Sequence, residues 1–348
     1  MNVLSEIKKS ENKTVSRQSR FRTSVFQNMP VIGLMLLLLL VACSALMLGT
    51  VSLSLEQLQS ILLGEGDPLL QFMVVEIRLP RVLSAIVTGA GFALAGLLMQ
   101  ILARNRLATP SIIGIDSAST TFVVIGLTAG WAIAPHWLAL LGAFVTASLI
   151  LVVARGTGTQ GHRFIITGLG IGAIASAMTQ LVLSRTNIDF VNQAFAWTVG
   201  SLNTPSVEAL KIASVGILIS FIITLFFRRT LQIMQFSDAR AIVLGCSIDK
   251  MRLFCLVLSV VTTALAVSVV GPVGFISLLG PEVARRLLGQ HKIPLLATCL
   301  VGSIFMILAD LIGRTAFAPL ELPVGMVTAI VGSPYLLWLL TRQPKGSI

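Results

Sequence analysis

Charged side chains are scarce in this chain of 348 residues, where Asp, Glu, Lys and Arg together make up only 11%. A soluble domain carries roughly 25% charged residues, whereas here 55% of the residues are hydrophobic and the mean hydropathy is +0.93. Apolar runs recur that are long enough to cross a bilayer, which takes about 20 residues. The composition excludes an ordinary soluble protein and predicts an all-α, polytopic membrane protein.

Residues that carry metal or catalytic chemistry are also few. The four cysteines show no CxxC spacing and the three histidines lie far apart, so neither a disulfide framework, a zinc site nor another metal or cofactor site is predicted. The sequence contains no Walker A motif, no HExxH and no GxSxG. We therefore expect no catalytic residues and no enzymatic activity, and any ATP hydrolysis would occur on a separate partner.

The net charge of +11 is high enough to raise the question of a nucleic-acid partner. The cations, however, are distributed between the hydrophobic runs instead of gathering on one soluble face. We expect no nucleic-acid partner, and membrane lipid as the surroundings of the chain.

The chain divides into a polar, basic segment at residues 1–29, interpreted as a cytoplasmic tail, and a transmembrane domain at 30–348. Charged breaks, prolines and glycines separate about ten predicted membrane spans. The run at 275–288 is short and is interrupted by Glu282, so we expect it to be buried among neighbouring helices. The predicted spans lie roughly at residues 30–49, 78–101, 112–130, 136–154, 164–184, 207–227, 252–270, 275–288, 294–313 and 323–340.

The distribution of the cations predicts the topology. If the amino terminus is inside, twenty of the 25 Lys and Arg residues fall in the tail and the inner segments, and five fall outside. Because cytoplasmic segments carry the excess of Lys and Arg, this division predicts that both termini are cytoplasmic. Arg78, Arg81 and Arg314 are among the five on the outer side.

Small residues are dense in several spans. The second predicted span contains Gly89, Gly91 and Gly96, and the fifth contains Gly168 and Gly172 at small-xxx-small spacing. Such residues let helix backbones approach closely. We expect tightly packed helices at these positions.

The longest predicted inner loop, residues 228–250, is more patterned than a simple linker requires. Its centre, Asp238 to Leu244, can form a short helix that Gly245 would stop. A solvated charged loop is one interpretation, and a docking surface for a cytoplasmic partner is the other.

Several segments resemble the permease subunit of type II ABC importers, the iron-siderophore and cobalamin uptake family. They are IRLPR at 77–81, RNRLATPSIIGID at 104–116, LG at 244–245, GPVGFISLLGP at 271–281 and LADLIGRTAFAPLELPVGMVTAIVGSPYLLWLL at 308–340. The last is the most specific, and together they cover most of the chain from residue 75 onward. Ser277 and the Pro281-Glu282 pair depart from the family pattern.

The resemblance implies two contact sites. Arg78, Arg81 and Arg314 would form salt bridges with glutamates of a solute-binding protein, whereas a simpler interpretation pairs Arg314 with Asp310 and Arg78 with Glu76. On the inner side, roughly Phe236 to Lys250 would form two short coupling helices for the ATPase. The coupling residues would be Asp238, Ala239, Arg240, Ala241, Leu244 and Gly245.

The resemblance further implies a permease of the bacterial inner membrane that translocates a ferric siderophore, with haem or cobalamin as alternatives. Its partners would be two ATP-binding cassette subunits, a periplasmic or lipid-anchored solute-binding protein and a second permease, identical or related. A different class of transporter is the alternative to an ATP-driven importer. An ion-coupled secondary transporter would need ionisable groups at membrane depth. Those groups are few here, and Asp310 has Arg314 one helical turn away to neutralise it.

Overall fold

The computed structural model describes residues 29–49, 51–155, 161–203, 205–289, 293–318 and 320–341. Within these ranges the chain is helical and contains no β-strand. Apart from Met29, the predicted tail lies outside the described residues.

Each of the ten predicted spans corresponds to a helix, because each apolar run is bounded by polar residues or by helix-stopping glycine and proline. They are the N-terminal helix (Met29–Met47), α4 (Leu79–Ala103), α5 (Ile115–Thr128), α6 (Pro135–Arg155), α7 (Gly161–Ser184), α9 (Val207–Phe226), α12 (Ile248–Val270), α13 (Ile276–Leu288), α14 (Leu295–Thr315) and α15 (Val324–Thr341).

The helices differ in whether they can cross a bilayer alone. In the described part of the chain seven helices are long and apolar enough to do so, and α5 and the first part of α15 are shorter apolar helices. The short, partly charged α13 is buried through Ile276, Ser277 and Glu282, as the sequence predicts for residues 275–288. The all-α, polytopic membrane fold is therefore confirmed.

The structure adds short elements that the sequence did not predict. They are α2 (Leu55–Leu62), α3 (Pro68–Phe72), a π-helical turn η1 (Met73–Arg78), the 3-10 turn η2 (Pro110–Ile113), α8 (Ile188–Val199) and α10 (Arg228–Ile233). Ser54 and Gln57 form a capping box at the start of α2. This Ser-x-x-Gln pattern is a readable signal for a helix start.

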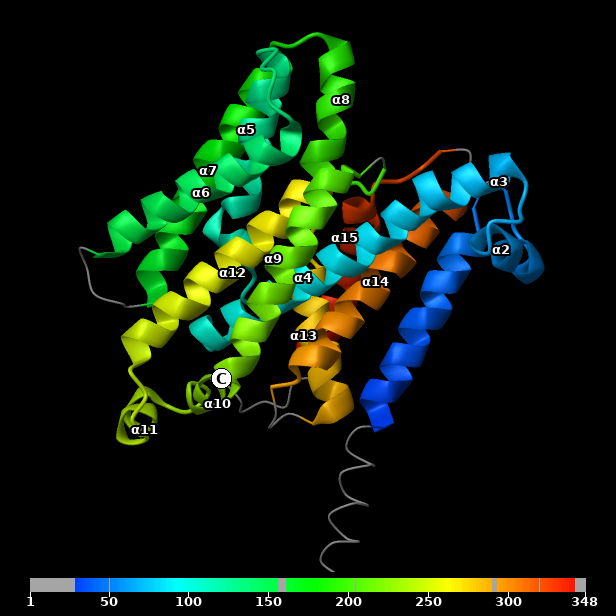
Figure 1. Cartoon of the computed structure of the whole chain (residues 1–348). Coiled ribbons are helices and arrows are strands. Elements are labelled where there is room, and N and C mark those ends of the chain that lie inside the picture. The colour runs from blue at the N-terminus through cyan, green and yellow to red at the C-terminus, as the bar shows by residue number, and fades with distance from the viewer. Residues whose placement is uncertain are drawn as a thin grey trace, which may run out of the picture.

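Helix α4 lies at the centre of the bundle. It contacts α9, α12, α13 and α14, while α5 packs with α6, α7 and α8, and α12 touches both groups. Figure 1 shows α5, α6 and α7 together on one side of α4, with α13, α14 and the N-terminal helix on the other. The 25 residues of α4 span about 37 Å at 1.5 Å per residue, so the helix connects the two ends of the molecule.

Close helix packing at the glycines is confirmed. A Cβ added at Gly89 would lie 2.5 Å from the carbonyl oxygen of Gly302 in α14, and one at Gly96 would lie 1.9 Å from that of Ser277 in α13. Gly168 and Gly172 face the turn at Ile113–Gly114 in the same way. These glycines hold α4 and α7 against their neighbours at distances that a larger residue would prevent.

Candidate functional site: the two ends of the bundle

Three arginines predicted as docking residues gather at one end of the bundle. Arg78 ends the π-helical turn, Arg81 lies in the first turn of α4 and Arg314 lies in the last turn of α14. Their residues are only 5%, 9% and 8% exposed. The structure brings the three together, with their side chains buried in this chain.

Arg78 and Arg314 bind the carboxyl end of the N-terminal helix. Arg78 donates from Nη1 to the carbonyl oxygens of Leu46 (2.7 Å) and Met47 (3.2 Å), and from Nη2 to that of Val51 (2.5 Å). Arg314 donates to the carbonyl oxygen of Ala45. The last carbonyls of a helix have no partner within the helix and carry its negative dipole end. The two guanidinium groups therefore cap this helix and fix it to α4 and α14.

Asp310 holds the other arginine contacts together. Arg81 Nε lies 2.9 Å from Asp310 Oδ1, Arg81 Nη1 lies 3.0 Å from Glu321 Oε2, and Arg314 Nε lies 3.7 Å from Asp310 Oδ2. Asp310 is 4% exposed, so its charge is compensated by two arginines instead of by water. The predicted Arg314–Asp310 pair is present. The alternative pairing of Arg78 with Glu76 is not observed, because the carbonyls take its place.

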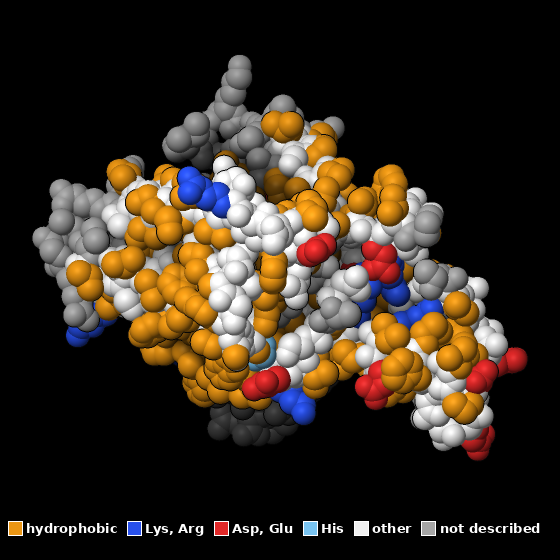
Figure 2. Space-filling view, turned by 90° about the horizontal axis from the view of Figure 1, so that it is seen from above, with side chains coloured by type: hydrophobic (Ala, Val, Ile, Leu, Met, Phe, Trp, Pro, Cys, Tyr) orange, Lys and Arg blue, Asp and Glu red, His pale blue; other side chains and the backbone are white. Residues whose placement is uncertain are grey.

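The outward surface at this end is mostly apolar. Figure 2 shows many hydrophobic side chains on this face, with acidic side chains both in its middle and towards one side, and basic side chains at several places between them. Among the acids, Glu56, Glu65, Asp67 and Glu76 are exposed. Of the five cations predicted for this side, Arg78, Arg81 and Arg314 are thus buried, whereas Arg185 and Lys211 are exposed.

At the opposite end, the predicted coupling helix is confirmed as a structural element. Helix α11 spans Asp238–Val243, ends at the cap residue Leu244 and is followed by Gly245 with φ of +80°. That backbone conformation favours glycine and stops the helix. Of the two short helices expected between Phe236 and Lys250, only α11 lies there. The other, α10, begins earlier, at Arg228, because it directly continues from α9.

Asp238 connects α11 to two long helices. Its carboxylate forms an ion pair with Arg104, which follows the last residue of α4, and lies 3.1 Å from Nη2 of Arg252 in the first turns of α12. Arg104 also donates from Nε to the carbonyl oxygen of Met234 at 3.2 Å. Movement of α11 is therefore linked by side-chain contacts to both α4 and α12.

The free face of α11 is apolar. Ile242, Val243 and Leu244 are exposed, Val243 to 86%, while Ala241 is buried against the bundle. Phe236, Ala239, Arg240, Val243 and Leu244 line an open groove. Apolar side chains exposed at the end of a membrane protein, outside its hydrocarbon-facing part, are typical of a surface that contacts another protein.

The two departures from the family pattern have local partners. Ser277 donates from Oγ to the carbonyl oxygen of Gly274 at 2.5 Å. Glu282 lies 3.4 Å from Arg285 and 3.2 Å from Arg286, one turn further along α13. Each polar group is therefore accommodated within its own segment, which explains how the short α13 remains buried.

Asp116 is the intramembrane acid that lacks such compensation. It accepts a hydrogen bond of 2.5 Å from Ser111 Oγ on one oxygen, and Oδ1 has no hydrogen-bond partner among the described residues. It is also buried, at 6% exposure. The described residues contain no group of three His, Cys, Asp or Glu side chains that could hold a metal ion.

The helices and the charged cluster at each end of the bundle define a polytopic membrane protein. Residues 36–342 match the model of the FecCD transport family, and the chain belongs to this family. It is a permease subunit of the bacterial inner membrane.

Similar proteins include the Fe(3+)-citrate import system permease protein YfmE of Bacillus subtilis, 33% identical over 93% of this chain and 99% of the relative. The hemin transport system permease protein HmuU of Yersinia pestis is 33% identical over 89% of this chain and 94% of its own length. A solved transporter of the metal-chelate ABC type, in an inward-facing conformation, superimposes with a TM-score of 0.79 at 27% identity, covering 91% of this chain and all of the other.

Proposed function

We propose that this chain is the membrane-spanning subunit of an ATP-driven importer that carries a ferric siderophore into the cell. The proposal rests on family membership together with one structural observation. The short helix α11 has an exposed apolar face, and Asp238 connects it by ion pairs to the long helices α4 and α12. Relatives named for iron citrate and hemin support an iron chelate as the cargo class. Haem and cobalamin are the alternatives within the same family.

The outer end is proposed to receive a solute-binding protein, periplasmic or lipid-anchored. Arg78 is the strongest candidate contact, because its hydrogen bonds within the described residues go to three neutral carbonyl oxygens and the Met73 sulfur. A glutamate from the partner would offer it a charge-assisted, bidentate bond. Arg81 and Arg314 already share Asp310, so a docking role for them requires an exchange of partners.

The inner end is proposed to bind the ATPase through α11. The exposed apolar residues of this helix would insert into a groove of the partner, and the ion pairs of Asp238 would transmit ATP-driven movement to α4 and α12. Two ATPase subunits and a second permease, identical or related, would complete the transporter. In this arrangement both termini of the chain are cytoplasmic, as the cation distribution predicts.

The cargo is tested by uptake in cells that lack their own permease of this family. Expression of this chain with its cognate ATPase and binding protein should restore uptake of a radiolabelled ferric siderophore. Haem and cobalamin serve as parallel arms. Uptake of either one without uptake of any ferric siderophore would overturn the cargo assignment while leaving the importer class intact.

Asp116 favours a second candidate function, an ion-coupled secondary transporter. A buried acid without a basic partner is the feature that proton or sodium coupling requires. Against it, Glu282 and Asp310 are neutralised by arginines. The two functions differ in one readout: an ionophore that dissipates ion gradients stops secondary transport and leaves ATP-driven uptake unchanged.

A further inference from the structure

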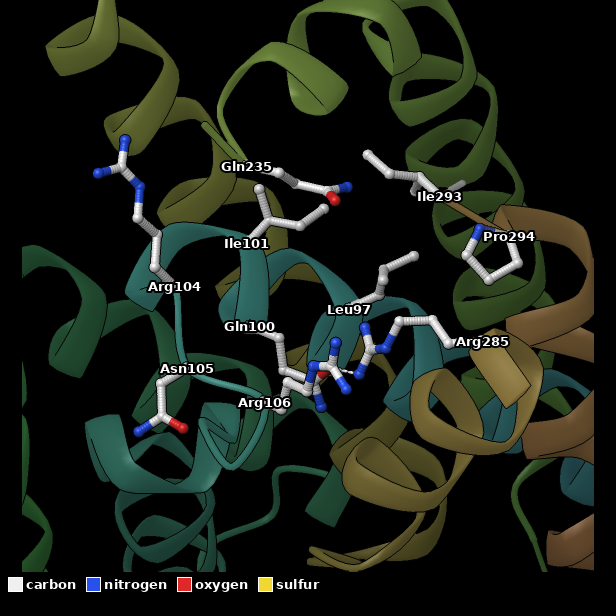
Figure 3. A pocket seen from close by; sticks show the side chains of 10 residues that line it. All are labelled: Leu97, Gln100, Ile101, Arg104, Asn105, Arg106, Gln235, Arg285, Ile293 and Pro294. Atoms are coloured by element: carbon white, nitrogen blue, oxygen red, sulfur yellow. Dashed lines mark hydrogen bonds between the residues drawn. The ribbon is translucent and has the colours of Figure 1, made fainter. Parts of the chain in front are cut away.

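A cavity of about 190 Å³ lies at the same end of the bundle as α11, several times the volume of a water molecule. It is bounded by the last turns of α4, the segment that follows α4, α13 and the residues before α14. Its polar lining consists of Gln100, Asn105, Arg106, Gln235 and Arg285, with Arg104 at its margin. Figure 3 shows Gln100, Arg106 and Arg285 converging, whereas the guanidinium of Arg104 points away from them.

Two buried donors in this cavity have no acceptor. Gln100 is 4% exposed, and its Oε1 accepts a hydrogen bond of 2.5 Å from Nη2 of Arg285. Gln100 Nε2 and Arg285 Nε, by contrast, have no hydrogen-bond partner among the described residues. Leaving buried N–H donors unpaired is unfavourable, so the cavity lacks an acceptor that these groups are positioned to bind.

The charge around the cavity has the sign that an anion requires. Arg106 lies close enough for its positive charge to act on Arg285. The carboxylate in contact with Arg285, that of Glu282, is shared with Arg286. One carboxylate thus lies against two arginines of α13, and Arg106 adds a further positive charge near Arg285.

We propose that this cavity binds the phosphate group of an anion, with Gln100 Nε2, Arg285 and Arg106 as its donors. A phosphate offers several acceptor oxygens, which suits donors that converge from α4, α13 and the segment between α4 and η2. Basic pockets between membrane helices at the cytoplasmic surface suit anionic lipid headgroups. The same chemistry is offered by free phosphate. The proposal depends on neither the cargo nor the ATPase partner.

The test uses the purified full-length chain, delipidated in detergent, with thermal unfolding followed by tryptophan fluorescence. One arm titrates inorganic phosphate against chloride at equal ionic strength. The other arm adds phosphatidylglycerol or, as its zwitterionic counterpart, phosphatidylcholine. The variants are Gln100→Glu, which supplies a fixed carboxylate to the arginines with almost no change in shape, and Arg285→Gln. Arg229→Gln, an exposed cation at the same end, is the matched control.

We expect phosphate, phosphatidylglycerol or both to raise the midpoint of unfolding of the wild type and of Arg229→Gln. Gln100→Glu should bind the same anion about tenfold more weakly or worse, while its stability without anion is at least that of the wild type because the carboxylate replaces the ligand. Stabilisation by phosphatidylglycerol alone assigns the site to lipid headgroups, and stabilisation by phosphate as well assigns it to the free ion. The proposal would be overturned if neither anion raised the unfolding midpoint of the wild type. It would also be overturned if the anion stabilised Gln100→Glu as much as the wild type. Both outcomes can be read even if Arg285→Gln fails to fold.

Discussion

Replacement of Asp310 by asparagine probes the buried ion-pair network that it forms with Arg81 and Arg314. The carboxylate lies 2.9 Å from Arg81 and 3.7 Å from Arg314, and the side chains of all three are at most 11% exposed. Removal of one partner from a buried pair costs about 3–5 kcal/mol, because the remaining charge stays buried and uncompensated. Asparagine keeps one acceptor oxygen for Arg81, so we expect a loss of about 3 kcal/mol in the free energy of unfolding.

Glu321→Gln is the matched control. It removes a carboxylate 3.0 Å from the same Arg81, but the Glu321 side chain is 39% exposed, and exposed pairs contribute about 1 kcal/mol or less. The assay is equilibrium unfolding in mixed detergent micelles, followed by the fluorescence of the four tryptophans. Equal losses for Asp310→Asn and Glu321→Gln, or a loss below about 1 kcal/mol for Asp310→Asn, would refute the reasoning that burial sets the strength of this network.

Three further predictions address packing, coupling and docking. Gly96→Ala should lower thermal stability sharply, because the added Cβ would lie 1.9 Å from a carbonyl oxygen of α13. Gly170→Ala is the control and should have little effect, since nothing lies within 4 Å of its Cβ. Equal effects of the two changes would contradict the close crossing of α4 and α13. Asp238→Asn should reduce uptake per ATP hydrolysed by about fivefold, since it weakens two partly exposed ion pairs worth ~1 kcal/mol together. Unchanged stoichiometry in proteoliposomes would exclude this link. Arg78→Gln should weaken the affinity of the permease for its binding protein about tenfold, measured with the permease immobilised on a surface. Arg185→Gln, on the same predicted side, should leave this affinity unchanged. Unchanged affinity for Arg78→Gln would rule out its docking role.

The membrane helices were predictable because a long uncharged run has few alternatives in a bilayer. With no water to satisfy backbone groups, such a run must form a helix, and all ten predicted spans from 30–49 to 323–340 contain one. Helix α11 was predictable for a local reason as well: Gly245 adopts φ of +80° and stops α11 where the sequence indicates. Arg81, Arg314 and Asp238 therefore lie on elements that the sequence predicts, whereas Arg78 ends the π-helical turn η1, which the sequence did not predict.

The contacts of these residues were less predictable. Arg78 is held by carbonyl oxygens of Leu46, Met47 and Val51, which are 27 to 32 residues away, and backbone acceptors leave no pattern in a sequence. The acid at Asp310 did indicate a partner, but only the nearer one, Arg314, was readable by helical spacing. Arg81, 229 residues away and in tighter contact, depends on how α4 packs against α14.

Short helices are the other part of the structure that the sequence did not predict. Helices α2, α3 and α8 are too short to be found as membrane spans, although the capping box at Ser54 marks the start of α2. The cavity beside Gln100 is lined by residues 97–106, by Gln235 and by residues between Arg285 and Pro294, which lie far from one another in the chain. Its unpaired donors become visible only when α4 and α13 are packed together.

We propose above that the chain is a passive gate that an ATPase drives. The most direct measurement is uptake of a radiolabelled ferric siderophore into proteoliposomes that contain this chain, with a second permease where the pair is mixed. The binding protein is added on one side, and the ATPase and MgATP are included or omitted. The account predicts accumulation only with the ATPase and MgATP, and no loss of accumulation when an ionophore is added. Accumulation without the ATPase that an ionophore abolishes would contradict it.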